Sequence, residues 1–374
     1  MSRSVPSTGL LSVYLDAIAD NWELLHQRMH SSGGNQGCAA VVKADAYGLG
    51  IKPVAMALWQ AGCRVYFVAT LNEAIELRQC LNDHAQIIVL GGICHGLGEE
   101  WQRYSLVPVL LDTSHITAWM SRFKESPCAI KVDTGMHRLG LSPQEYEAAL
   151  PNLKGMNVSL VMSHLACADV PEHPLNVHQQ RVFANIASIT RQHLSRAKLS
   201  FANSSGLFLG EQFYFDVGRP GAALYGVNPN SSFSNPMKPV VRLQLPIMQV
   251  KTIPAGDCAG YGAGFVATRE TRLAVVFGGY ADGLLRALSH SGCVLLNGYK
   301  APIVGRVSMD SLIVDVTDAP DAAIENGWVD IIGADQSIDA LAQAAGTIGY
   351  EILTSFGKRY QRRYLSNDIE VESE

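Results

Sequence analysis

Residues 41–50 read VVKADAYGLG, and this stretch sets the pattern for the first two-thirds of the chain. Two β-branched residues end at a single lysine, Lys43, and Tyr47 follows among small residues and glycines. The pattern predicts a buried strand over 39–42 with Lys43 at its carboxyl end. Such a lysine either reaches past apolar surface to water or, when partly removed from water, has a lowered pKa and a reactive amine. The stretch by itself leaves both readings open.

Strand-like and helix-like patterns alternate through about the first 230 residues. Apolar runs that predict strands lie at 39–42, 65–69, 87–90, 106–110, 129–132 and 159–162, with shorter runs at 199–202 and 222–227. Helical periodicity lies between them, at 18–29, 54–59, 72–80 and 175–193, and Ser142-Pro143-Gln144-Glu145 has the form of a capping box that begins another helix. The alternation favours a (β/α)8 barrel, which usually has about 200 to 250 residues. A doubly wound open sheet is the competing fold, and periodicity does not separate the two.

The composition changes after Asn228. The segment NPNSSFSNPMKP (228–239) is rich in Asn, Ser and Pro and is typical of a linker. Beyond it, runs at 241–250, 273–277, 302–307 and 311–316, with one short helix over 338–345, predict a mainly β domain. We therefore expect an α/β chain with a (β/α)8 barrel over 12–238. A mainly β C-terminal domain would follow over 239–374, joined by the N-terminal segment 1–11.

Composition excludes several classes of protein. Of the 374 residues, 48% are hydrophobic and 17% are charged, which is ordinary for a globular enzyme. The formal net charge of −5 argues against a nucleic-acid or anionic-membrane partner. No signal peptide or membrane span is evident, and eight cysteines without a CxxC pair are typical of reduced thiols. We expect a cytoplasmic protein with no metal site. The sequence contains neither GxxxxGK[ST] nor GxGxxG, so no motif indicates a nucleotide-binding site.

Eight blocks, in order along the chain, resemble the signature blocks of the alanine racemase family. They are VVKADAYGLG (41–50), KVDTGMHRLG (131–140), SHLACAD (163–169), ANSSG (202–206), GRPGAALYG (218–226), AGYGAGFVA (259–267), GGYADGLLR (278–286) and VGRVSMDSLIVDV (304–316). Eight ordered blocks are a far more specific signal than any single one. The resemblance implies a barrel that carries pyridoxal 5′-phosphate (PLP), a C-terminal β domain, and a homodimer in which each active site is completed by the partner.

The resemblance also implies catalytic roles. Lys43 would bind PLP covalently and act as one of two bases, and Tyr261 of the partner subunit would act as the other. Arg219 would donate to the pyridine nitrogen of PLP, and His164 would link this arginine toward Tyr261. An arginine that keeps its proton leaves the pyridine nitrogen neutral, which favours return of a proton to Cα over transamination.

Further residues match the family's ligand-binding positions. The phosphate would be held by Tyr47, Ser204, Tyr350 and the backbone N–H groups of Gly221 and Ala222. The substrate carboxylate would meet Arg138, whose planar fork suits carboxylates, and the backbone at Met309. Lys131 matches a lysine that is often carbamylated in this family and then holds the arginine in place; an unmodified lysine paired with Asp133 is the alternative.

The chain departs from the family pattern at Asp45, Leu49 and Ser308, where Asn, His and Cys are common; none of these positions matches an assigned catalytic role. We expect a racemase that interconverts L- and D-alanine and supplies D-alanine for peptidoglycan. The alternatives are a broader-specificity racemase that accepts serine, a PLP decarboxylase on the same scaffold, and a non-catalytic PLP-binding barrel.

Overall fold

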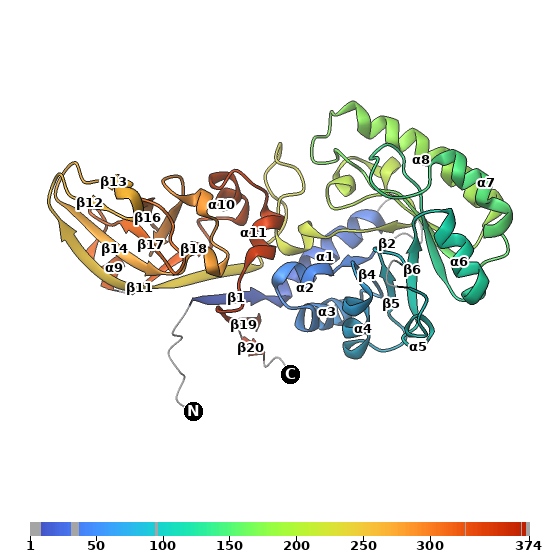
Figure 1. Cartoon of the computed structure of the whole chain (residues 1–374), viewed down its shortest axis with the longest axis horizontal. Coiled ribbons are helices and arrows are strands. Elements are labelled where there is room, and N and C mark those ends of the chain that lie inside the picture. The colour runs from blue at the N-terminus through green and yellow to red at the C-terminus, as the bar shows by residue number, and fades with distance from the viewer. Residues whose placement is uncertain (1–8, 31–36, 94–95, 326, 368, 372–374) are drawn as a thin grey trace. The chain divides into compact units, whose positions relative to one another are not determined.

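Strands and helices alternate through the first part of the structure, a computed structural model that describes residues 9–30, 37–93, 96–325, 327–367 and 369–371 (Figure 1). The chain divides into two compact units, one of residues 18–238 and one of residues up to 17 together with 239 onward. Each unit has a sheet of its own.

Seven parallel strands run in sequence order through the first unit. They are β3 (Ala40–Val41), β4 (Val65–Val68), β5 (Gln86–Val89), β6 (Leu106–Leu110), β7 (Cys128–Lys131), β8 (Val158–Met162) and β9 (Lys198–Ser200). Their register is parallel throughout, as in Val65 opposite Gln86. Every residue of β6 and β7 is buried, including Lys131 at the end of β7, so these strands form the core of the unit.

An eighth strand closes this sheet into a barrel. β10 (Val217–Gly218) pairs in parallel with β2 (Gly37–Cys38), which leads into β3. The Arg219 N–H donates to the Ala202 carbonyl at 2.9 Å, just beyond β9. On the other side, the Val41 N–H donates to the Pro220 carbonyl at 3.0 Å. The strand order therefore returns to its start, which confirms the (β/α)8 prediction and excludes the doubly wound sheet.

Helices follow the strands and lie around them (Figure 1). They are α1 (Leu15–His30), α3 (Ile51–Gln60), α4 (Leu71–Cys80), α5 (Glu100–Arg103), α6 (Thr113–Phe123), α7 (Pro143–Leu153) and α8 (Pro174–His193), with 3-10 turns η1 (Ser205–Phe208), η2 (Glu211–Phe213) and η3 (Ala222–Tyr225). The predicted capping box begins α7, since the Ser142 hydroxyl accepts from the Glu145 N–H and the Glu145 carboxylate accepts from the Ser142 N–H.

The second unit is mainly β. Its nine-stranded sheet has the order β14-β17-β16-β15-β18-β11-β1-β19-β20. The strands are β1 (Leu10–Tyr14), β11 (Val241–Ile253), β14 (Thr271–Phe277), β15 (Cys293–Leu296), β16 (Tyr299–Val304), β17 (Ser311–Asp315), β18 (Trp328–Ile332), β19 (Gln361–Ser366) and β20 (Ile369–Val371). β11 pairs along different parts of its length with β18 and with β14, so six antiparallel strands close on themselves.

This unit differs from the sequence prediction in three respects. Residues 12–17, expected in the barrel, belong here because β1 pairs with β11 and β19. Strands β1, β15, β18, β19 and β20 were not predicted from the sequence. Two further helices, α9 (Asp321–Glu325) and α11 (Gly349–Ser355), accompany the expected α10 (Ile338–Ala344).

Two features of the described residues concern membrane-spanning helices and disulfide bonds. No helix among them is both long enough and apolar enough to cross a bilayer. The seven described cysteines are free thiols, and Cys94 lies outside the described residues.

Asn21 on α1 fastens this helix to the end of the barrel segment. Its side chain donates to the Leu224 and Lys238 carbonyls at 3.2 and 3.0 Å and accepts from the Lys238 N–H at 2.8 Å. Asn21 is 1% exposed, and its hydrogen bond to the Leu224 carbonyl is buried.

We expect Asn21→Ala to lower the free energy of unfolding by about 2–4 kcal/mol, since it leaves buried polar groups without partners. Urea denaturation measures this loss. Asn152→Ala, at an exposed position of α7, should change stability by less than about 0.5 kcal/mol. Equal effects of the two substitutions would contradict the role given to Asn21.

Candidate active site

Lys43 is followed by one turn of left-handed backbone. Ala44, Asp45, Ala46 and Tyr47 have φ between 53° and 57° and ψ between 36° and 50°, so the segment Lys43–Gly48 (α2) is not a regular helix. Left-handed helical backbone costs about 1–2 kcal/mol per residue when a Cβ is present. Strain of this kind persists only where surrounding contacts determine the conformation, and it gathers at functional sites.

Local hydrogen bonds join the turn to the helix that follows it. The Ala46 N–H donates to the Val42 carbonyl at 2.9 Å, and the Gly50 N–H donates to the Asp45 carbonyl at 2.9 Å. The Asp45 side chain accepts from the Ile51 N–H at 2.7 Å, at the first residue of α3. Asp45, one of the departures from the family pattern, thus serves as a helix cap from within the turn.

Five basic side chains gather at the carboxyl ends of the barrel strands. Lys43 follows β3, Lys131 ends β7, His164 follows β8 and Arg219 follows β10, while Arg138 lies in the loop after β7. Each of these strands points the same way, so the residues share one mouth of the barrel. The sequence-predicted Lys43, Lys131, Arg138, His164 and Arg219 are therefore brought together.

Burial and mutual repulsion lower the pKa values of this cluster. Burial, then Arg138, lowers the pKa of Lys43. The pKa of Lys131 falls to about 8, chiefly through burial and then through Arg138 and Arg219. Burial followed by Arg219 holds the pKa of His164 well below its usual value, so this imidazole is neutral at pH 7. The site consequently holds amines that lose protons more easily than free lysine does.

Arg219 is fixed by buried acceptors. Its Nη1 donates to the Ser200 hydroxyl and its Nη2 to the Ser163 carbonyl, both at 2.5 Å. Nη2 also lies 3.4 Å from Nδ1 of His164. Since arginine has no acceptor, Nδ1 must accept, which leaves the histidine proton on Nε2. Burial lowers the pKa of Arg219 to about 9, still well above neutral, so the guanidinium keeps its proton.

Ser200 lies in none of the quoted blocks and carried no sequence signal. Ser163 opens the block SHLACAD (163–169), but no role was predicted for it. They form part of a buried network beneath the site. The Ser163 hydroxyl shares a hydrogen bond of 2.8 Å with the Thr134 hydroxyl, and Gln179 donates to Thr134 and to the His164 carbonyl. The network ties β8 and its following residues to α8.

Part of the predicted phosphate site is assembled near Arg219. The Ser204 hydroxyl accepts from the Gly221 N–H at 3.0 Å and from the Ala223 N–H at 3.2 Å. A Cβ on Gly221 would lie 2.4 Å from the Tyr47 hydroxyl, so only glycine allows this approach. Ala222 begins η3 directly afterwards. Tyr47, Ser204, Gly221 and Ala222 are therefore neighbours, and in this structure the Gly221 N–H donates to Ser204.

The loop that carries Arg138 wraps around a carboxylate. Asp133 accepts hydrogen bonds from the backbone N–H groups of Gly135, Met136 and Arg138 at 2.8, 2.9 and 3.2 Å. Burial acts to raise the pKa of Asp133, but hydrogen bonds from this loop outweigh it and lower the pKa. The Asp133 carboxylate thus fixes the backbone of this loop through hydrogen bonds. Arg138 itself is exposed.

Three predicted residues lie in the second unit. Tyr261 is in the turn η4 (Tyr261–Ala263) and is 71% exposed, and Met309 is 53% exposed. Tyr350 is half-buried at the second residue of α11. The phenol and the amine that the sequence paired as bases therefore belong to different units of the chain.

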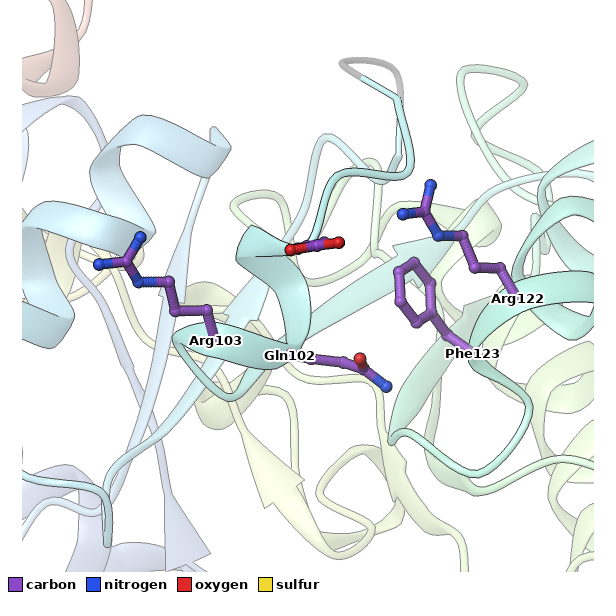
Figure 2. Close-up of a pocket in the computed structure, with 5 residues that line it drawn as sticks. Gln102, Arg103, Arg122 and Phe123 are labelled. Atoms are coloured by element: carbon purple, nitrogen blue, oxygen red, sulfur yellow. The ribbon is translucent and has the colours of Figure 1, made fainter.

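A separate surface depression contains none of the predicted residues. It has a volume of about 400 Å³ and is lined by Glu99, Gln102, Arg103, Arg122 and Phe123 (Figure 2). Figure 2 shows the Arg103 guanidinium pointing away from Phe123. These side chains lie on or beside the outer helices α5 and α6, whereas barrel chemistry takes place at strand ends. The candidate site is therefore the basic cluster around Lys43.

Comparisons with known proteins show which family the chain resembles over nearly its whole length. The alanine racemase N-terminal domain model matches residues 13–229, and the alanine racemase C-terminal domain model matches residues 240–364. A catabolic alanine racemase of Agrobacterium fabrum is 44% identical over 367 residues, which cover 96% of this chain and 92% of that protein. An alanine racemase of Rhodospirillum rubrum is 44% identical over 372 residues, covering 97% and 98%.

A solved structure is also similar over nearly the whole chain. The alanine racemase of Bartonella henselae, with covalently bound pyridoxal phosphate, has a TM-score of 0.88 and 39% identity. The match covers 96% of this chain and 100% of that one.

The lowered pKa of Lys131 predicts a pH-dependent stability. An unfolded lysine titrates at 10.5 and the folded one at about 8, so between these values the unfolded chain binds more protons and stability rises with pH. In CO2-free buffer we expect the free energy of unfolding to gain roughly 2–3 kcal/mol from Lys131 across this interval. Urea denaturation of wild type and Lys131→Met, compared at each pH, isolates the contribution. Lys154→Met, at an exposed position, should keep the wild-type slope, and a wild-type slope in Lys131→Met would refute the assignment.

Proposed function

The chain belongs to the alanine racemase family, and we propose that it interconverts L- and D-alanine with pyridoxal 5′-phosphate as its cofactor. The observation that carries this proposal is the meeting of Lys43, Arg219 and the Tyr47–Ser204–Gly221 cluster at one mouth of the barrel. An amine, a buried guanidinium and a group of hydroxyls and backbone amides fit the aldehyde, the ring nitrogen and the phosphate of PLP.

The residues of the barrel fit the cofactor. Bound PLP supplies an aldehyde that condenses with amines and a ring that withdraws electrons from the substrate Cα. Lys43 would hold the aldehyde carbon, and its lowered pKa leaves more of the amine uncharged than in a free lysine. Arg219 would face the ring nitrogen. The phosphate would be held by Tyr47, Ser204, Gly221 and Ala222 of the barrel and by Tyr350 of the second unit.

Arg219 influences the outcome at Cα. Because the guanidinium keeps its proton, it would donate a hydrogen bond to the ring nitrogen without transferring a proton to it. Electron withdrawal by a neutral ring is weaker, which favours return of a proton to Cα over transamination. Ser200 and Ser163 hold the guanidinium in its buried position.

Inversion at Cα requires two bases on opposite faces, and we assign Lys43 and Tyr261 to them. Tyr261 would come from the partner subunit of a homodimer. Its 71% exposure supports this assignment, as does the exposure of Met309, Val266 and Met248 in the same unit, since exposed apolar side chains often mark an interaction surface. The substrate carboxylate would be bound by Arg138 and the Met309 backbone.

Carbamylation of Lys131 would relieve the crowding of positive charge. Lys131 is 9% exposed, and the positive charges of Arg138, Arg219 and Lys43 repel its ammonium group. The nearby Asp133 carboxylate already accepts hydrogen bonds from the backbone of its own loop. In the reaction, the neutral amine nitrogen attacks the carbon of CO2, an N–C bond forms, and one proton is released. The resulting anion would pair with Arg138 and fix it for the substrate.

We place the reaction in the cytoplasm, where the free thiols of the chain would remain reduced. The physiological role would be the supply of D-alanine for peptidoglycan. A D-alanine requirement for growth in a strain that lacks the protein tests this role, and growth without D-alanine would point to the catabolic role that one relative's name states.

The primary test follows L-alanine in deuterated water with the purified, PLP-loaded protein. We expect optical rotation to be lost as deuterium enters Cα, and no CO2 to be released. L-Serine should react at least about tenfold more slowly if the site is specific for the smaller side chain. Equal rates would favour the broader-specificity racemase, and a lack of reaction with both substrates would favour a non-catalytic PLP-binding barrel.

Hybrid dimers test the shared site. Lys43→Ala and Tyr261→Phe should each be nearly inactive alone, because each lacks a base at both sites of the dimer. After unfolding and refolding together in equal amounts, we expect about a quarter of wild-type activity, because half the dimers are hybrids and each has one intact site. A mixture that stays inactive would mean that both bases come from one chain.

Carbon-13 labelling tests the modified lysine. Wild-type protein equilibrated with 13C-labelled CO2 should show one carbamate resonance in the NMR spectrum, and Lys131→Met should lack it. Lys154→Met should retain the signal. A wild-type spectrum without the resonance would remove carbamylation from the proposal.

A further inference from the structure

The left-handed turn after Lys43 is held from outside by a side chain of the next βα unit. The Ala44 N–H, the first of the turn, donates to Oε1 of Glu73 at 2.8 Å. Glu73 lies 29 residues further along the chain, on the first turn of α4. The left-handed residues and this carboxylate are therefore joined across two neighbouring strand ends, those of β3 and β4.

Glu73 also has a local role, which uses its other oxygen. Its Oε2 accepts from the Ala69 N–H at 2.7 Å and from the Thr70 N–H at 3.2 Å, and the Thr70 hydroxyl accepts from the Glu73 N–H. This is a capping box that begins α4. A capping box alone needs one oxygen of the glutamate, so the bond to Ala44 is additional.

We propose that Glu73 is a positioning residue for Lys43, which fixes the left-handed turn through Ala44 and so sets the direction in which the lysine leaves the barrel strand. The inference rests on the proposed function only in giving Lys43 its chemical role. Glu73 itself touches neither substrate nor cofactor in this account.

The charge of Glu73 acts on the same lysine. Burial and Arg138 lower the pKa of Lys43, and Glu73 opposes them. Lys43 in turn acts on Lys131 and His164, so the titratable groups that interact with it are Arg138, Lys131, His164 and Glu73. Glu73 is the only carboxylate in this set, so its removal should leave the amine among groups that are cationic or neutral.

Backbone exchange gives the first test. Glu73→Gln keeps the shape of the side chain, but glutamine has an NH2 group in place of one carboxylate oxygen. It therefore cannot accept hydrogen bonds from both Ala44 and Ala69. In the cofactor-free protein, we expect amide hydrogen exchange in peptides covering residues 43–50 to accelerate about tenfold or more. The matched control is Thr70→Ala, which weakens the cap of α4 but leaves the bond between Glu73 and Ala44. Equal acceleration in both variants would overturn the proposal.

The pKa of the Lys43 amine gives the second test, measured by competitive acetylation at a series of pH values with mass spectrometry of the Lys43 peptide. Because an anion near the ammonium is lost, we expect the pKa in Glu73→Gln to fall by about half a unit or more. Thr70→Ala and Glu76→Gln, which removes an exposed carboxylate of the same helix, should leave it unchanged. An unchanged pKa in Glu73→Gln would also overturn the proposal.

Both measurements use cofactor-free protein, so a failure of racemase activity would not affect their result. Should Glu73→Gln fail to fold, the double variant Ala44→Gly/Glu73→Gln replaces it, because glycine adopts positive φ without the Cβ penalty. Recovery of folding together with a lowered Lys43 pKa supports the proposal. A double variant that stays unfolded, or that has the wild-type pKa, contradicts it.

Discussion

The strained backbone of residues 44–47 is the constraint on which the site depends. Four consecutive non-glycine residues in the left-handed region are unfavourable by themselves, and they form here because contacts on several sides hold them. The same turn gives Lys43 its place at the strand end and brings the Tyr47 hydroxyl against Gly221. One conformational feature thus joins Lys43 to the cluster that we propose binds the phosphate.

The electrostatics of the barrel mouth follow from what surrounds the turn. Lys43, Lys131, Arg138 and Arg219 share one region, and Asp133 is occupied by backbone N–H groups of its own loop. Such a cluster is destabilising in isolation, because cations repel one another in a region from which water is partly excluded. It becomes favourable when anions enter it. A phosphate, a substrate carboxylate and a carbamate on Lys131 would supply these charges, so ligand binding and protein stability should be linked.

The residues proposed to bind the cofactor and the residue proposed to complete a second subunit's site differ in burial. Arg219 is 4% exposed and is held by Ser200 and Ser163. Tyr261, in contrast, is on an exposed turn among glycines in the other unit. A buried scaffold is suited to hold a cofactor, whereas a residue that completes the site of a second subunit must lie on the surface of its own chain.

The alternation of strands and helices, the start of α7 and the family of the chain could all be predicted from the sequence alone. These features are readable because hydrophobic periodicity, helix caps and residue blocks are local properties. The tertiary structure decided the closure of the barrel, since β10 has only two residues and its partners are β2 and the segment after β9. It also decided the left-handed turn, the link from Glu73 to Ala44 and the lowered pKa values of Lys131 and Arg219. Each of these arises from groups that are far apart in the chain and become neighbours, or lose water, only when the whole unit has folded.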